Sequence, residues 1–293
     1  MHLFLLDVGY GLVTASILAL SAVAFTLEYA VSRVANLAHG EILTVGAYTA
    51  FLVQRATGSV LAAAAAAAAA VAGAVTGYGT NLLLIERFSR RPILVTFIAT
   101  LGASLVLQNV LTMFFGASSR AYTIKQGAPQ SYGPFSFTHA ELLVIASAVV
   151  ITVLLFLLLQ RTKFGKSLRA VAENRDLARS SGIHARRVIA QTWLLAGFVA
   201  GFAGFVLAEN VGAFSPGFGN GFLLVTITAT VAGGLGRPYG TLLGAVLVGL
   251  VLELAGAYTS SSYELAFAFA ILVLLLLVRP NGLLVRGSRT VTA

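Results

Sequence analysis

Long apolar stretches separated by short polar segments run along almost the whole chain. A membrane-spanning helix needs about 20 mostly apolar residues, and nine stretches approach or reach that length. Two of the nine are short enough to be half-helices or re-entrant segments. The predicted spans are 8–30, 40–54, 59–80, 92–115, 139–160, 188–208, 221–235, 239–257 and 263–279. The pattern predicts an all-α fold, a polytopic membrane helix bundle of eight or nine transmembrane segments that forms a single domain over 1–293.

One long polar segment, 161–187, interrupts this pattern. It contains eight of the 19 lysines and arginines of the chain. Basic residues accumulate in loops on the cytoplasmic side of membrane proteins. We therefore predict that 161–187 is a cytoplasmic loop.

The remaining basic residues predict the orientation of the whole chain. With the amino terminus outside and the carboxyl terminus inside, only three of the 19 basic residues lie outside: Arg55, Arg120 and Lys125. The opposite orientation would place the other 16 outside, against the positive-inside rule. Nine crossings fit the favoured orientation, and with eight segments one of the short ones does not cross fully.

The composition supports a protein that is integral to the membrane. The chain is 58% hydrophobic and 10% charged, whereas soluble domains carry about 25% charged residues. A net charge of +9 is also compatible with nucleic-acid binding, but these charges lie in short loops between apolar spans, so no nucleic-acid partner is expected. Cysteine is absent, which excludes disulfides and thiol chemistry.

The sequence around Lys166 has part of a phosphate-binding loop. Gly165, Lys166 and Ser167 match the end of that motif, but Gln160 stands where its first glycine is required. The motif also follows a strand, whereas a predicted membrane span precedes it here. We expect no nucleotide, metal or other cofactor to bind to this chain.

The polar segment contains a helical pattern over 166–181. Apolar residues recur at helical spacing, and Gly182 stands where a residue that ends a helix belongs. Two interpretations remain open. The helix is either a contact for a cytoplasmic partner or an amphipathic helix on the membrane surface.

A polar group, His39-Gly40-Glu41, lies where the first predicted span meets the short second one. No third metal ligand accompanies it. The group is either a non-helical break buried in protein or facing a cavity, or a loop at the membrane surface. Nearby, Glu28 has either a local ion pair with Arg33 or a role in transport.

Three stretches together resemble a known family. RVANLAHGEI (33–42) with GAY (46–48), RAVAENRDLARSSGI (169–183), and GGLGRPYGTLLG (233–244) followed by RPNGLL (279–284) are similar to signatures of bacterial branched-chain amino acid ABC transporter permeases. Their order and spacing agree over roughly 10–285, and the length suits the shorter of the two paralogous permease subunits.

The resemblance implies three groups of functional residues. The coupling helix that contacts the ATPase includes Arg169, Ala172, Glu173, Asn174, Ala178 and Gly182. The candidate translocation pathway includes Asn36, His39, Gly40, Glu41, Gln108 and Asn109. Glycines expected to pack helices together are Gly233, Gly234, Gly236, Gly240 and Gly244.

The resemblance also implies the setting. The chain would be a multi-pass subunit of the bacterial inner membrane that works by alternating access. Its partners would be a second, paralogous permease, two cytoplasmic ATPases that hold ATP and Mg²⁺, and a periplasmic or lipid-anchored binding protein. Two alternatives stay open: a permease for urea or short amides, and a stand-alone secondary carrier.

Overall fold

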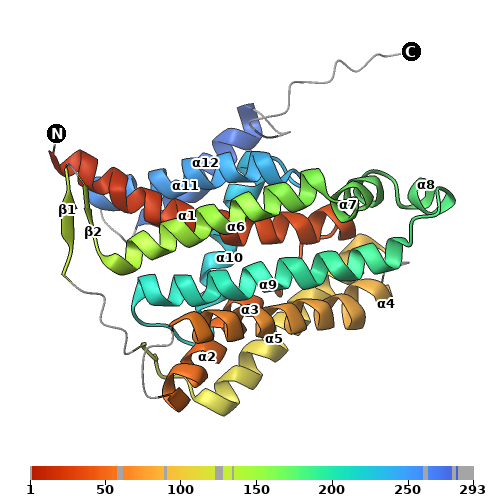
Figure 1. The fold of residues 1–293 in the computed structure, drawn as a ribbon, viewed down its shortest axis with the longest axis horizontal. Coiled ribbons are helices and arrows are strands. Elements are labelled where there is room, and N and C mark those ends of the chain that lie inside the picture. The colour runs from red at the N-terminus through yellow and green to blue at the C-terminus, as the bar shows by residue number, and fades with distance from the viewer. Residues whose placement is uncertain are drawn as a thin grey trace.

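The computed structural model describes residues 2–57, 62–88, 91–122, 128–133, 135–259, 263–278 and 282. It is a bundle of long helices with one small hairpin (Figure 1). The prediction of a helical fold is confirmed. Lys125 and most of the carboxyl-terminal signature 279–284 lie outside the described residues.

The elements follow one another along the chain as α1 (His2–Ser32), α2 (His39–Thr57), α3 (Ala62–Thr80), the π-helical turn η1 (Asn81–Ile85), α4 (Glu86–Phe88), α5 (Ile93–Phe115), β1 (Gln130–Tyr132), β2 (Phe135–Phe137), α6 (His139–Arg161), α7 (Lys163–Glu173), α8 (Arg175–Ser180), α9 (Ala185–Val211), α10 (Phe218–Gly233), α11 (Pro238–Tyr258) and α12 (Glu264–Val278). The strands β1 and β2 pair antiparallel.

Six of the described helical segments are long and apolar enough to cross a membrane. They are α1, α3 with its continuation through η1 and α4, α5, α6, α9 and α11. The helix α10 and part of α12 are apolar but shorter, and α2 is less apolar than the six. Eight or nine crossings and the orientation of the chain remain predictions.

The core of the bundle depends on very close contact between α3 and α9. A Cβ atom added at Gly73 would lie 2.3 Å from the carbonyl oxygen of Gly197, and one added at Gly201 would lie 2.2 Å from that of Ala69. No side chain fits into such a gap. Small residues allow helix backbones to approach in this way within lipid, which explains the alanine-rich sequence of α3.

A second close contact joins α10 to α11, and it involves the glycines singled out from the sequence. A Cβ atom at Gly233 would lie 2.2 Å from the carbonyl oxygen of Gly240, and one at Gly244 would lie 2.1 Å from that of Ala229. Gly234 and Gly236 form the turn between the helices with φ of 105° and 78°, a region that favours glycine. Helix α11 then begins with Pro238, a residue suited to a first helical turn.

The two ends of the bundle carry different structures. The hairpin β1–β2 lies at one end, and α7 and α8 lie at the other (Figure 1). Between them, α5 and α6 keep most of their apolar residues exposed. Such helices suit contact with lipid or with another membrane subunit.

The single helix predicted over 166–181 is wrong in one respect, because the structure has two helices there. The break is at Asn174, whose side-chain oxygen accepts hydrogen bonds from the backbone N–H groups of Asp176 and Leu177, 3.0 Å each. An asparagine in this role starts a new helix. The glycine two residues after α8 behaves as the sequence predicts, since Gly182 has a left-handed φ of 81°.

Candidate functional site

Helices α1 and α2 are joined by a short non-helical break, 33–38, in the interior of the bundle. Arg33 begins it with a φ of 58°, unusual for a residue with a Cβ atom. The Arg33 guanidinium donates a hydrogen bond to the carbonyl oxygen of Ala172 in the last turn of α7. Asn36 and His39 are buried, so His39-Gly40-Glu41 is at a break enclosed by protein and not in a surface loop.

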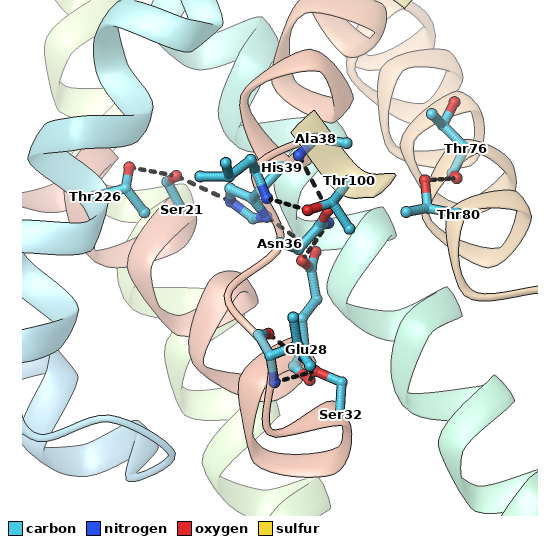
Figure 2. A network of polar contacts seen from close by, with 12 residues as sticks. Ser21, Glu28, Ser32, Asn36, Ala38, His39, Thr76, Thr80, Thr100 and Thr226 are labelled. Atoms are coloured by element: carbon cyan, nitrogen blue, oxygen red, sulfur yellow. Dashed lines mark hydrogen bonds and ion pairs between the residues drawn. The ribbon is translucent and has the colours of Figure 1, made fainter. Parts of the chain in front are cut away.

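The side chain of Glu28 organises this break (Figure 2). One carboxylate oxygen lies 2.9 Å from Nδ1 of His39, and the other accepts a hydrogen bond of 2.8 Å from the Asn36 amide. All three side chains are almost fully buried, with exposed fractions of 0% or 1%. The sequence suggested an ion pair between Glu28 and Arg33, but the Arg33 side chain is directed to α7 instead. The contact of Glu28 with His39 was not predicted.

The contacts continue from His39 to helix α10. Nε2 of His39 lies 3.3 Å from the hydroxyl oxygen of Ser21, and that oxygen lies 2.9 Å from the hydroxyl oxygen of Thr226. The ring of Phe25 packs edge-on against the imidazole. We call Ser21, Glu28, Asn36, His39 and Thr226 the Glu28 cluster, which links α1, the break, α2 and α10 (Figure 2).

Glu41 lies two residues after His39 in α2 and is also fully buried, with 0% of its surface exposed. In contrast to Glu28, neither of its carboxylate oxygens has a hydrogen-bond partner among the described residues. The hydroxyl of Thr44, one turn away, donates to the carbonyl oxygen of Gly40. A buried ionised carboxylate without a partner is energetically costly, and either a proton or a positively charged group removes that cost.

Glycine allows α10 to contact α2 beside Glu41. A Cβ atom at Gly219 would lie 2.0 Å from the carbonyl oxygen of Gly40 and 2.5 Å from the hydroxyl of Thr44. The next residue, Asn220, accepts a hydrogen bond of 3.2 Å from Ser104 of α5. The first turns of α2 and α10 therefore meet, with α5 alongside.

The two predicted pathway residues of α5 have different surroundings. Gln108 lies against the start of α10, because a Cβ atom at Gly217 would be 2.7 Å from its Nε2. Asn109 is exposed, and its amide donates to the carbonyl oxygen of Leu105 in its own helix. The structure thus brings Gln108 toward Gly40 and Glu41 but does not bring Asn109 there.

Aromatic side chains pack two turns further along α2 from Glu41. The ring of Tyr48 is 4.4 Å from Phe115 and 5.2 Å from Phe214 between centroids. Tyr122, from the segment before the hairpin, contacts Phe214 and donates a hydrogen bond of 2.9 Å to the carbonyl oxygen of Ala47. Burial, and secondarily the charge of Glu209, raise the pKa of Tyr122, so its hydroxyl stays protonated. These rings fill the bundle between Glu41 and the hairpin end.

The residues predicted to contact an ATPase divide into an inner and an outer group. Ala178 is buried, and Arg169 is exposed but is tied to the bundle because it donates to the carbonyl oxygen of Leu159. Glu173 and Asn174 are exposed. The segment formed by α7 and α8 is thus held to the bundle by one face. It leaves a short exposed corner, Glu173 and Asn174, where α7 meets α8.

Ser21 and Thr226 were not predicted from the sequence as members of a site. A signal for Ser21 was present, because it precedes Glu28 by seven residues, two helical turns, and so shares its face of α1. Thr226 has no comparable signal, since its contact with Ser21 depends on how α10 packs against α1.

Comparisons with known proteins agree with the motifs. A family model described as the permease component of branched-chain amino acid transport systems matches residues 8–277. The high-affinity branched-chain amino acid transport system permease protein LivH of Escherichia coli K12 is 30% identical, over 97% of this chain and 96% of that one. BraD of Pseudomonas aeruginosa, with the same description, is 29% identical over 94% of each chain.

Similarity extends to permeases with other named substrates. The ribose import permease protein RbsC of Escherichia coli K12 is 30% identical, over 90% of this chain and 82% of its own length. Among solved structures, PsaBC from Streptococcus pneumoniae in complex with Fab superposes with a TM-score of 0.50 at 12% identity, covering 93% of this chain and 91% of that one. At that identity the likeness concerns the fold alone.

Proposed function

Because this chain belongs to the family of permease components of branched-chain amino acid transport systems, we propose that it carries branched-chain amino acids across the membrane as a subunit of an ABC importer. The chain is a transport permease and not an enzyme. ATP and Mg²⁺ bind to partner ATPases, and this chain holds no cofactor.

The observation that carries the substrate class is the unpartnered carboxylate of Glu41. The ammonium group of an amino acid supplies the positive charge that a buried carboxylate requires. Urea and short amides can donate N–H hydrogen bonds to Glu41 but have no cationic group to neutralise its charge. The substrate carboxylate is placed near the amino terminus of α10, where unpaired backbone N–H groups favour a negative charge.

In the proposed orientation, the end with α7 and α8 is cytoplasmic and the hairpin end is periplasmic. The exposed corner at Glu173 and Asn174 contacts an ATPase, and a second, paralogous permease completes the membrane unit in the inner membrane. A binding protein delivers substrate at the hairpin end. The aromatic rings around Tyr48 close that side, so this conformation does not admit substrate from the periplasm.

The orientation is tested by labelling, because the chain has no cysteine of its own. Ser131→Cys in β1 and Ser180→Cys in α8 both place a thiol at an exposed position. A membrane-impermeant maleimide applied to intact spheroplasts should label position 131 and not position 180. Labelling of position 180 alone would reverse the orientation.

The substrate class is tested by uptake in proteoliposomes that contain the assembled transporter and its binding protein. We expect ATP-dependent uptake of radiolabelled leucine that excess isoleucine or valine inhibits and that excess urea, acetamide or ribose leaves unchanged. Uptake of urea or ribose in place of leucine would overturn the assignment. Uptake that continues without ATP would indicate a secondary carrier.

A further inference from the structure

A second polar pocket lies at the end of the bundle that carries α7 and α8, apart from Glu41 and the Glu28 cluster. It is a cavity of about 110 Å³ between α1, η1, α4, α5, α8 and α9. Its charged and amide side chains are Asn81, Glu86, Arg91, Arg175 and Arg186. No role described above uses any of these residues. Pockets for drug-sized ligands measure about 300–1,000 Å³, so this cavity suits a smaller molecule.

Two buried polar atoms in this pocket have no partner among the described residues. They are Oδ1 of Asn81, an acceptor, and Nε of Arg175, a donor. Asn81 is only 3% exposed and begins the π-helical turn η1, an irregularity that is frequent at functional sites. An unsatisfied buried polar group costs about 1–3 kcal/mol. A ligand that offers both an acceptor and a donor would satisfy both atoms.

The charges of the pocket favour a ligand that carries an anionic group. Arg186 forms an ion pair with Glu86, so this carboxylate is already neutralised. The pocket lining as a whole carries three arginines, Arg91, Arg175 and Arg186, against one glutamate. Burial, and secondarily the charge of Arg179, lower the pKa of Arg175 against the opposing charges of Asp176 and Glu86, and a nearby anion further favours the charged guanidinium.

The rest of the wall is mostly apolar, with the hydroxyl side chains of Ser32 and Thr96 among it. Val31 of α1, Ile85 of η1 and Ile189 of α9 line the same cavity. Inorganic phosphate would satisfy the arginines, and its protonated oxygen can donate to Asn81, but it would leave these apolar side chains without a contact. A molecule with a carboxylate, an ammonium group and a short aliphatic chain matches all three parts of the pocket.

We propose that this pocket binds a free apolar amino acid from the side of the membrane that carries α7 and α8. The ligand carboxylate binds Arg175 and Arg91, its ammonium group donates to Oδ1 of Asn81, and its aliphatic chain contacts Val31 and Ile85. The choice of an amino acid as ligand rests on the proposed function. Because Arg175 belongs to α8 and Asn81 to η1, the ligand connects the segment formed by α7 and α8 to the membrane helices.

This arrangement provides a control on transport by its own product. An amino acid that accumulates in the cytoplasm fills the pocket and favours the conformation in which Arg175 of α8 and Asn81 of η1 line one cavity. A ligand shifts a conformational equilibrium only by its differential affinity for the two states. Movement of α8 opens the pocket, so bound amino acid slows the transport cycle.

The binding experiment uses the assembled transporter without its binding protein and with Glu41→Gln, so that the proposed pathway contributes little. Binding of radiolabelled leucine is measured by equilibrium dialysis. We expect Asn81→Leu and Arg175→Gln to weaken binding at least tenfold. Thr80→Val and Arg187→Gln serve as matched controls, because Thr80 bonds within its own helix and neither residue lines the pocket.

A folding defect is separable from a loss of binding. Asn81→Leu removes an acceptor that has no partner, so the ligand-free protein should unfold at the same or a higher temperature. Leucine should raise the unfolding temperature of the parent protein and of both controls but not that of Asn81→Leu. Leucine binding that both pocket variants retain, or that 10 mM phosphate abolishes, would overturn the proposal.

A transport arm with native Glu41 separates this proposal from the proposed function. Leucine preloaded on the ATP side of proteoliposomes should slow initial uptake at least threefold in the parent and in Thr80→Val, and not in Asn81→Leu. Equal slowing in all three would overturn the product control. Absence of leucine uptake in every protein, with pocket binding intact, would reject the proposed function and keep this site.

Discussion

Glu28 and Glu41 are two buried carboxylates on either side of the same break, and their surroundings are opposite. Each oxygen of Glu28 has a partner, one on His39 and one on Asn36. Neither oxygen of Glu41 has one among the described residues. Burying a charge is tolerated when hydrogen bonds and an opposite charge compensate. The first carboxylate is therefore held by its neighbours within the fold, and the second is the one for which we propose a solute as partner.

The largest effect on stability is expected from removing the carboxylate of Glu28, the one whose oxygens have partners. Glu28→Ala leaves the buried His39 ring and the Asn36 amide without their acceptor, which should lower the free energy of unfolding by about 3–5 kcal/mol. Thermal unfolding of the purified permease in detergent measures this change. Glu28→Gln, which keeps an acceptor for one partner, should lose much less, and equal losses in both variants would show that the loss comes from the carboxylate charge and not from the acceptor that glutamine keeps.

A smaller effect is expected where α10 approaches the unpaired carboxylate. Gly219→Ala places a methyl group against the Gly40 carbonyl oxygen and the Thr44 hydroxyl, so α2 and α10 must separate. Such overpacking costs about 1–3 kcal/mol, and leucine uptake should fall along with the unfolding temperature. Gly221→Ala is the matched control in the same helix, because nothing lies within 4 Å of the Cβ atom it adds. Similar losses in the two variants would contradict a specific contact.

The smallest effect on stability is expected at the unpaired carboxylate itself. Glu41→Gln keeps the shape of the side chain and breaks no hydrogen bond, so the free energy of unfolding should change by less than about 1 kcal/mol. Leucine uptake should nevertheless fall at least tenfold, because the amide cannot neutralise an ammonium group. Normal uptake by this variant would show that Glu41 is not a substrate contact, and a large loss of stability would show that it has a structural role.

The long helices could be predicted because apolar length alone determines them. Spans such as 92–115 and 139–160 agree closely with α5 (Ile93–Phe115) and α6 (His139–Arg161). The left-handed Gly182 could also be predicted, since glycine after a helical pattern has few other uses. These features depend on neighbours in sequence.

Features that depend on side-chain hydrogen bonds were harder to predict. The break at Asn174 depends on one asparagine side chain that caps α8. The spacing of apolar residues gives no sign of this break. The partner of Glu28 is eleven residues away, across a break whose path is set by the left-handed Arg33. The lack of a partner for Glu41 has no sequence signal, because it depends on whether the surrounding helices place a hydrogen-bond donor beside the carboxylate.

The hydrogen bond from Arg33 to the carbonyl oxygen of Ala172 has a mechanical consequence. It anchors one end of the short segment 34–38, and His39 lies at the other end. A pull on α7 therefore reaches the imidazole along a few peptide units. Thermodynamic coupling acts equally in both directions, so a solute that displaces His39 also shifts α7, and its arrival in the membrane interior becomes detectable at the surface of the protein.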